Sequence, residues 1–211
     1  MKIDFLRREY KLSVLSLEMM DKNPIVQFEN WFKVAIDSNV EDANAMSLVT
    51  IGTDGFPQSR IVLLKYFEEK GFTFFTDYNS EKGNAIKKNN AVGLHFYWKK
   101  LERQVRISGY AEKTNSGISD KYFYSRPILS QISAMVSNQS QVIESREILE
   151  KKFEEIRKQL DEKKPVRPEN WGGYIVKPVK IEFWQGRETR LHDRILYEKN
   201  NNKWMMKRLA P

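Results

Sequence analysis

Cysteine is absent from this sequence of 211 residues, and histidine occurs only twice. Without cysteine the chain has no disulfides, no thiolate nucleophile and no zinc or iron–sulfur site held by thiolates. The two histidines, His95 and His192, stand 97 positions apart, and no His-x-x-x-His or paired carboxylate motif accompanies them. We therefore expect no metal site.

Several motifs for nucleotide binding and hydrolysis are missing as well. The chain has no Gly-x-Gly-x-x-Gly stretch and no Gly-x-x-x-x-Gly-Lys-Ser/Thr stretch, which disfavours Rossmann and P-loop sites. The Gly-x-Ser-x-Gly elbow of serine hydrolases is also absent. Any phosphate group bound by this protein must therefore be held by side chains.

Long apolar runs are missing too. No 18 consecutive apolar residues occur, and the N-terminus MKIDFLRREYKLSV has no apolar stretch of signal-peptide length. We expect a soluble protein that does not enter a membrane, and the lack of cysteine favours a cytoplasmic location. Lys and Arg number 36 against 28 Asp and Glu, a net charge of +8, so the surface should attract nucleic acid, acidic lipid or small phosphorylated molecules.

Hydrophobic spacing predicts an α+β chain that is mainly antiparallel β, with short strands that close into a barrel. Residues 1–211 are expected to form a single domain, of which 1–22 make a mobile N-terminal arm. Helices are predicted over 24–38, 80–90, 117–136 (two short helices broken at Pro127) and 144–161. Strands are predicted over 45–52, 59–67, 71–78, 91–98, 103–113, 174–186, 193–200 and 203–211.

Cations and hydroxyls stand where they suit phosphate. Arg60 and Lys65 bracket the apolar run IVLL; being five apart they point to opposite faces of an ideal strand, so they serve two different anions or a bulge intervenes. Tyr122, Arg126 and Ser130 share one helix face if the helix continues past Pro127. A phenol, a guanidinium and a hydroxyl in that order would make a cradle for a phosphate dianion.

The stretch RLHDR places a titratable ring between two permanent cations. Arg190 and Arg194 disfavour the protonated form of His192, whereas Asp193 favours it. His192 is therefore expected to be a neutral hydrogen-bonding group near pH 7. The other histidine, His95, lies among apolar strand residues and is interpreted as a strand histidine paired within the fold.

Ten stretches, all in the same order, resemble the pyridoxamine 5'-phosphate oxidase family. They are RREY (7–10), SRIVLLK (59–65), LERQVRISG (101–109), KYFYSRP (121–127), SQIS (130–133), NQSQ (138–141), WGGY (171–174), IEFWQG (181–186), RLHDR (190–194) and RLAP (208–211). The resemblance implies an FMN-binding split barrel with peripheral helices and a homodimer with two FMN sites at the subunit interface. It also implies oxidation of pyridoxamine 5'-phosphate and pyridoxine 5'-phosphate to pyridoxal 5'-phosphate, with O2 reduced to H2O2.

The same resemblance implies the site residues. FMN would be bound by Arg60, Ile61, Val62, Leu63, Leu64, Lys65, Phe75, Thr76, Lys82, Gln104, Gln139, Ser140, Trp184 and Arg194. Of these, Gln104, Trp184 and Arg194 would surround the flavin ring, some of them from the partner subunit. The substrate would be bound by Arg7, Arg8, Glu9, Tyr10, Lys65, Tyr122, Arg126, Ser130, Arg190, Leu191 and His192. Arg190 and His192 would lie against the pyridine ring as the catalytic pair, with Arg194 biasing the flavin towards its anionic reduced form.

Two positions depart from the family's pattern. Glu81 stands where the family commonly has a cation just before Lys82, and it would repel an FMN phosphate unless it points away. Phe75 stands where a tyrosine is common, which matters little if that contact is made by the backbone.

Two other functions fit parts of the sequence. One is a basic β-barrel that binds nucleic acid by stacking Phe74, Phe96 and Tyr97 on bases, with no bound flavin and a steep salt dependence. The other is a split-barrel flavin protein that has changed its substrate, or that binds FMN or pyridoxal 5'-phosphate without turnover.

Overall fold

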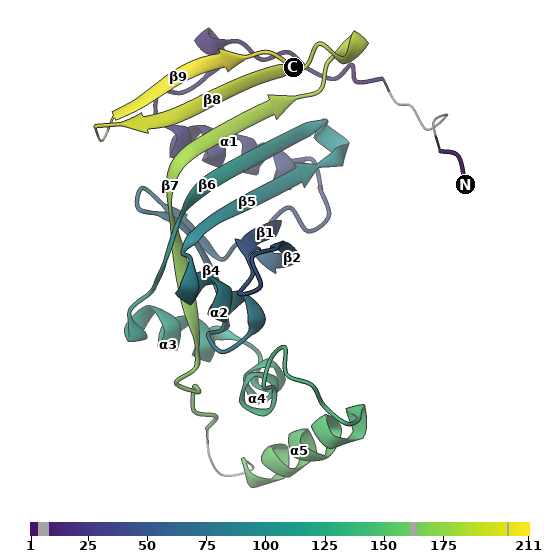
Figure 1. Cartoon of the computed structure of the whole chain (residues 1–211), viewed down its shortest axis with the longest axis vertical. Helices are drawn as coiled ribbons and strands as arrows, with labels where there is room; N and C mark the ends of the chain where they lie inside the picture. The colour runs from purple at the N-terminus through teal and green to yellow at the C-terminus, as the bar shows by residue number, and fades with distance from the viewer. Residues whose placement is uncertain (4–8, 161–163, 202) are drawn as a thin grey trace.

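The computed structural model describes residues 1–3, 9–160, 164–201 and 203–211, and in this part of the chain one curled antiparallel sheet has helices on one face and at one end (Figure 1). The strands are β1 (Ala45–Ile51), β2 (Pro57–Leu63), β3 (Tyr66–Glu68), β4 (Gly71–Asp77), β5 (Ala91–Trp98), β6 (Arg103–Lys113), β7 (Trp171–Gln185), β8 (Asp193–Asn200) and β9 (Lys203–Leu209). The helices are α1 (Pro24–Asp37), α2 (Glu81–Lys88), α3 (Ser116–Ser125), α4 (Ile128–Val136) and α5 (Arg146–Gln159), with 3-10 turns η1 (Leu17–Met19), η2 (Lys99–Leu101) and η3 (Glu188–Arg190).

The long strand β7 organises the sheet. On one edge β7 pairs with β6, and on the other edge its first half pairs with β4 and its second half with β8. The sheet therefore forks along β7. Figure 1 shows the result: β8 and β9 lie at one end of the molecule, and α3, α4 and α5 lie at the opposite end.

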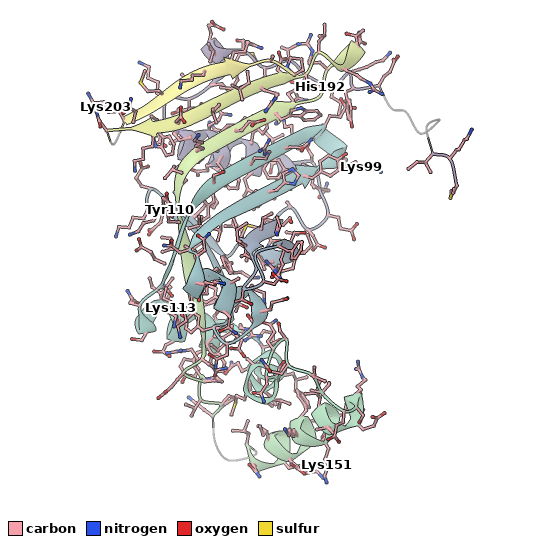
Figure 2. All side chains as sticks on the ribbon, in the orientation of Figure 1. Lys99, Tyr110, Lys113, Lys151, His192 and Lys203 are labelled. Atoms are coloured by element: carbon pink, nitrogen blue, oxygen red, sulfur yellow. The ribbon has the colours of Figure 1, made fainter. Side chains whose placement is uncertain are left out.

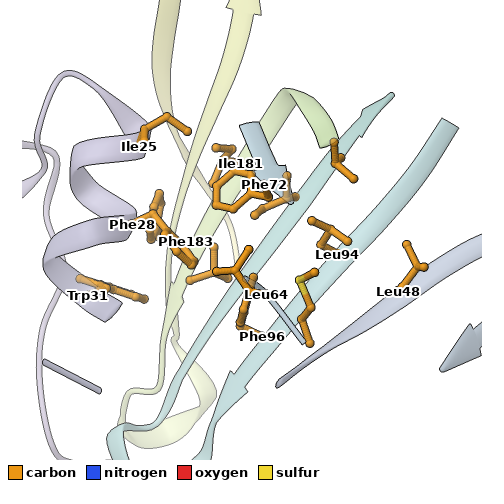
Figure 3. Close-up of a cluster of buried hydrophobic side chains, with 14 of the residues drawn as sticks. Ile25, Phe28, Trp31, Leu48, Leu64, Phe72, Leu94, Phe96, Ile181 and Phe183 are labelled. Carbon is orange, nitrogen blue, oxygen red and sulfur yellow. The ribbon is translucent and has the colours of Figure 1, made fainter. Parts of the chain in front are cut away.

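Helix α1 covers the sheet with its aromatic face. Asn23 caps the helix by accepting the Ile25 N–H at 2.8 Å, and Pro24 occupies the first turn, where its missing N–H costs nothing. Phe28 is fully buried, and its ring packs edge-on against Phe72 with centroids 5.0 Å apart (Figure 3). Full burial of such a ring stabilises the fold by about 2–3 kcal/mol.

Most of the predicted elements are confirmed, but the strand expected over 59–67 is wrong. It divides into β2 and β3, because the chain changes partners between them. The Leu64 N–H donates to the Asn44 carbonyl on one side, and the Lys65 N–H donates to the Thr73 carbonyl on the other. The alternative of one straight strand with Arg60 and Lys65 on opposite faces therefore does not apply.

Some element ends also differ from the prediction. β7 begins at Trp171 rather than 174, because the WGG segment already pairs with β4. The connection between β5 and β6 contains the 3-10 turn η2, which is followed by Glu102, whose backbone is left-handed with φ 54°. Asp54 and Gly55 lie in the hairpin turn between β1 and β2, where Gly55 has φ 89°, a conformation that glycine adopts without strain.

The exposure of three aromatic side chains tests the alternative that this protein binds nucleic acid by stacking on bases. Phe74 and Phe96 are fully buried, so they are not available to stack on bases, whereas Tyr97 is about half exposed. Among the helices that the structure describes, none is long and apolar enough to cross a membrane.

Candidate active site

A cavity of about 560 Å³ opens where β2, β4, α2, α3, α4 and the start of β7 meet. Most of the residues that sequence resemblance assigns to FMN and to the substrate phosphate line it together. The lining residues are Ile61, Val62, Leu63, Lys65, Phe75, Thr76, Asp77, Lys82, Tyr122, Arg126, Pro127, Ser130, Ser133, Ala134, Ser137, Gln139 and Trp171. We call this cavity the phosphate pocket.

Lys82 provides a buried cation on one side of the phosphate pocket. Its Nζ donates to Gln139 Oε1 at 2.9 Å and to Ser80 Oγ at 3.2 Å. Burial and, to a smaller extent, the nearby Arg60 guanidinium lower the pKa of Lys82 to about 8. Because burial disfavours the charged form, an anion placed here would stabilise the protonated amine.

Gln139 joins this cation to β4. Thr76 Oγ1 donates to the same Gln139 Oε1 at 2.9 Å, so one amide oxygen accepts from both Thr76 and Lys82. Ser140 follows with a left-handed backbone at φ 70° and is exposed, and it does not line the pocket.

Arg60 lies behind this wall rather than in it. Its Nη1 donates to Thr50 Oγ1 at 2.7 Å and to the Gln58 carbonyl at 3.2 Å. Glu81 accepts from Gln58 Nε2 at 2.9 Å, and its charge opposes the lowering of the pKa of both Arg60 and Lys82. Glu81 is therefore engaged beside the cations and is not among the residues that line the pocket.

The predicted substrate-phosphate group meets on the other side of the same pocket. Lys65, Tyr122, Arg126 and Ser130 all line it. The predicted break at Pro127 is confirmed: α3 ends at Ser125 and α4 begins at Ile128, so Tyr122, Arg126 and Ser130 do not share one continuous helix. Arg126 instead has an extended backbone at ψ 153° between the two helices, because the Pro127 ring disfavours the helical conformation for the residue before it.

Arg126 carries an unsatisfied donor. Its guanidinium carbon lies 4.8 Å from the centroid of the Trp171 ring, and burial lowers its pKa. Within the described residues, Arg126 Nη1 is buried and has no hydrogen-bond partner. A buried guanidinium N–H without an acceptor is costly, so this group points to an anion that completes the site.

An aromatic stack forms the wall beside Arg126. The rings of Phe75 and Tyr122 stack with centroids 4.0 Å apart, and Trp171 lies nearly parallel to both. Arg167 fixes Trp171 by donating to its carbonyl at 2.6 Å while pairing with Asp120 at 2.6 Å. Sequence reasoning used WGGY only for resemblance and assigned Trp171 no role, because no residue pattern shows which strand end will face a pocket.

The remaining predicted residues gather at the far end of β7. Gln104 of β6 lies opposite Trp184 of β7, and Trp184 lies opposite Arg194 of β8. Directly opposed residues of adjacent strands share a face of the sheet, so these three side chains form one surface. His95 Nε2 and Gln104 Oε1 are 2.9 Å apart, which agrees with the interpretation of His95 as a paired strand histidine.

His192 packs on this surface. Its ring lies 4.7 Å from the Trp184 ring and 5.5 Å from the Tyr10 ring, measured between centroids. The Arg187 N–H donates to His192 Nδ1 at 3.1 Å, so the neutral ring carries its proton on Nε2. Burial lowers the pKa of His192, and Arg190 lowers it further.

The neighbours of His192 differ from the expectation in one respect. The Asp193 carboxylate binds Arg187, Arg208 and the Leu15 N–H, and it is not among the groups that shift the pKa of His192.

Arg190 is exposed and has a left-handed backbone at φ 63°. Such backbones in non-glycine residues persist only where the surroundings hold them, and they concentrate at functional sites.

Other predicted residues of this end are placed as follows. Arg194 forms a two-point ion pair with Glu182, at 2.8 Å from Nε and 3.1 Å from Nη2, so much of its charge is already offset. Leu191 and Glu9 are exposed. Arg7 and Arg8 lie outside the described residues. We call Tyr10, Gln104, Trp184, Arg190, His192 and Arg194 the histidine cluster.

The phosphate pocket and the histidine cluster lie at opposite ends of one strand. Trp171 begins β7, and Trp184 stands 13 residues further on. At about 3.3 Å per residue, this length of strand spans up to roughly 40 Å. Figure 2 shows His192 at the β8 end, far from α3 and α4. Within one chain, therefore, a single small ligand does not reach both groups.

No group of three or more His, Asp and Glu side chains suited to a metal ion occurs in the described part of the chain. The expectation of no metal site rests on the sequence.

Comparison with known proteins identifies relatives along the whole chain. Residues 32–160 match the family described as pyridoxamine 5'-phosphate oxidase, and residues 171–211 match the pyridoxine 5'-phosphate oxidase C-terminal dimerisation region. The chain is 51% identical over 212 residues to the pyridoxine/pyridoxamine 5'-phosphate oxidase of Aliarcobacter butzleri, with 100% of both chains covered. It is 49% identical over 207 residues to that of Nostoc punctiforme, covering 98% of this chain and 97% of the relative.

Solved structures show the same fold. PhzG from Burkholderia lata 383, in complex with tetrahydrophenazine-1-carboxylic acid, superposes with a TM-score of 0.89 at 27% identity, covering 95% of this chain and 100% of that chain. A pyridoxamine 5'-phosphate oxidase-related, FMN-binding protein from Nostoc punctiforme superposes with a TM-score of 0.69 at 16% identity, covering 87% and 95%. The split-barrel fold expected from the sequence is confirmed.

Proposed function

The chain belongs to the pyridoxamine 5'-phosphate oxidase family of oxidoreductases, and on that premise we propose that it oxidises pyridoxamine 5'-phosphate and pyridoxine 5'-phosphate to pyridoxal 5'-phosphate with FMN as cofactor. The observation that carries this proposal is the phosphate pocket, where cations line one cavity from two sides. Lys82 lies on one side, and Lys65 and Arg126 lie on the other. Cations on both sides suit two phosphorylated ligands held side by side.

The pocket residues fit FMN. Lys82, Thr76 and Gln139 offer a buried ammonium, a hydroxyl and an amide to the cofactor's phosphate and ribityl chain. Ile61, Val62 and Leu63 bring the end of β2, with its backbone polar groups, to the same cavity. FMN bound there would supply an acceptor for a hydride equivalent from the substrate's C4' carbon and would be reoxidised by O2, giving H2O2.

The unpaired donor of Arg126 supports a substrate phosphate. An anion that enters the pocket would give Arg126 Nη1 an acceptor, and Lys65, Tyr122 and Ser130 line the same cavity. Charge-assisted bonds from arginine to phosphate are strong and directional. Holding the phosphate fixes the distance from there to the reacting carbon, which is the protein's main contribution in a cofactor enzyme.

The histidine cluster would hold the pyridine end of the substrate. Neutral His192 can donate a hydrogen bond from Nε2 to a ring substituent, and Arg190 adds a cation beside it. Gln104, Trp184 and Arg194 would border the flavin ring. Because this cluster lies at the far end of β7 from the phosphate pocket, we infer a homodimer in which one subunit's histidine cluster completes the other subunit's phosphate pocket. The match of residues 171–211 to a dimerisation region supports this arrangement.

A visible spectrum followed by anaerobic titration tests the proposal. We expect the purified protein to be yellow, to bleach when pyridoxamine 5'-phosphate is added without air, and to recover its colour with release of H2O2 when air is admitted. A yellow protein that does not bleach would favour a relative with another substrate or none. A colourless protein that takes up no FMN would contradict the cofactor assignment.

A further inference from the structure

Two carboxylates form hydrogen bonds with the backbone of residues 11–15. The N–H groups of Lys11 and Leu12 both donate to Glu102 Oε2, at 2.9 and 3.1 Å. Three residues further on, the Leu15 N–H donates to Asp193 Oδ2 at 3.0 Å. The segment is thereby held along the histidine cluster from Tyr10 onwards.

Glu102 is built into the fold in an unusual way. It is buried, with 3% of its surface exposed, and its backbone is left-handed at φ 54° in the connection between β5 and β6. Its carbonyl accepts the Gly186 N–H at 2.8 Å. The side chain and the backbone of one residue thus join the N-terminal segment to the end of β7.

Gly186 makes room for the ring that this arrangement holds. A Cβ atom on Gly186 would lie 2.7 Å from Tyr10 Cγ, which is closer than real Cβ contacts. The Tyr10 ring stands edge-on to Trp184, with centroids 5.6 Å apart and planes at 89°, and edge-on to His192. The Tyr10 ring therefore packs against Gly186, Trp184 and His192.

We propose that Glu102 is a positioning residue for substrate binding. By accepting the N–H groups of Lys11 and Leu12, it holds the Tyr10 ring against Trp184 and His192. A carboxylate suits the task because one oxygen accepts two N–H donors, and bonds to an ionised acceptor are the stronger kind. Glu102 needs no contact with the substrate, since it acts on the wall that the substrate touches. This inference rests on the proposed function, because it assigns Tyr10 to the substrate site.

Kinetics of Glu102→Gly and Glu102→Gln test the proposal in the full-length dimer. Glycine accepts the left-handed backbone and removes the carboxylate, whereas glutamine keeps one amide oxygen as acceptor. For Glu102→Gly we expect KM for pyridoxamine 5'-phosphate to rise about tenfold, the effect of losing charge-assisted bonds, with kcat and FMN affinity nearly unchanged. Glu102→Gln should restore most of the lost affinity.

Two further variants separate positioning from a purely structural role. Gly186→Ala should displace Tyr10 from the opposite side and raise KM in the same way, even if Glu102→Gly fails to fold. In a Tyr10→Ala background, Glu102→Gly should add no further rise in KM, because the two act through one contact. Glu188→Gln is the matched control: it removes an exposed ion pair to Lys11, 3.7 Å long, and should leave KM unchanged.

Trypsin cleavage after Lys11 gives a readout that does not depend on turnover. Releasing the segment should speed this cleavage by about tenfold or more in Glu102→Gly, and not in Glu188→Gln. An unchanged KM in both Glu102→Gly and Gly186→Ala, additive KM effects with Tyr10→Ala, or unchanged cleavage would overturn the inference. A parent protein that oxidises neither B6 phosphate would overturn the proposed function alone, and the cleavage rates would still decide the role of Glu102.

Discussion

Lys82 and Gln139 stand 57 positions apart in the chain and meet through a 2.9 Å hydrogen bond from Nζ to Oε1. The bond joins the first turn of α2 to the connection between α4 and α5, and Thr76 of β4 donates to the same oxygen. Three separate elements therefore converge on the place that we assign to the FMN phosphate.

FMN affinity should weaken as the pH rises through about 8, the pKa of Lys82 in the free protein. A bound dianion stabilises the ammonium and keeps it protonated, whereas the free protein loses that proton, so binding takes up a proton at alkaline pH. Fluorescence titration of the apoprotein should give a Kd several-fold higher, up to about eightfold, at pH 9 than at pH 7.5. Lys82→Arg stays charged and should lose this dependence; an equal pH dependence in both proteins would contradict the assignment.

Arg126→Met should separate function from stability. Loss of the phosphate contact should lower kcat/KM by about 100-fold or more, equivalent to about 2.7 kcal/mol. The apoprotein should be as stable as the parent or more stable, because a buried donor without a partner is removed. Thermal unfolding at matched protein concentration measures this.

Arg167→Met is the matched control for Arg126→Met. Its guanidinium is satisfied by Asp120 and the Trp171 carbonyl, so its removal should destabilise the protein by about 2–4 kcal/mol. If Arg126→Met lowered the melting temperature as much as Arg167→Met, Arg126 would be a structural residue.

The tautomer of His192 predicts which substitution retains activity. Because Nδ1 accepts the Arg187 N–H, the donor that faces the substrate is Nε2. Glutamine places an amide N–H near Nε2, whereas asparagine mimics Nδ1, so His192→Gln should retain at least about tenfold more activity than His192→Asn. The opposite order would reverse the assigned tautomer.

The pH profile of kcat/KM adds a second test of His192. Its lowered pKa keeps the ring neutral at neutral pH, so protonation should reduce the rate only below pH 6.5, the ordinary value for histidine. The acid limb should disappear in His192→Gln. A limb centred well above pH 6.5 that belonged to His192 would mean that the ring works as a cation.

The aromatic core should account for a large part of the stability. Phe28 is fully buried against Phe72 and Phe96, so Phe28→Ala should lower the free energy of unfolding by about 3–5 kcal/mol. Val34→Ala on the same helix is the control, since Val34 is 41% exposed and should cost little. Denaturant titration at one protein concentration compares the two.

The order of elements could be predicted from the sequence because hydrophobic period and turn residues are local signals. The break between β2 and β3 could not, because it depends on which strands Leu64 and Lys65 meet across the sheet. The sequence showed that Pro127 would break the helix. It did not show that the break places the Arg126 guanidinium beside the Trp171 ring, because that contact depends on the position of β7.

The resemblance to the family named most of the residues that line the phosphate pocket. Residue chemistry alone identified only cations that are scattered along the chain. Trp171 and Glu102 received no role because each acts through geometry: one faces a pocket, and the other binds backbone N–H groups more than 80 positions away. The engagement of Arg194 by Glu182 was hidden for the same reason, since the two meet across β7 and β8.

Complementation between two inactive variants tests most directly whether each site is formed by two subunits. Arg126→Met damages the phosphate pocket and His192→Asn damages the histidine cluster, so a purified heterodimer of the two should have one undamaged site of two and about half the parent activity. A heterodimer of Arg126→Met with Lys65→Met, both in the phosphate pocket, should stay inactive. If the first heterodimer were no more active than the two variant homodimers, the two-subunit site would be contradicted.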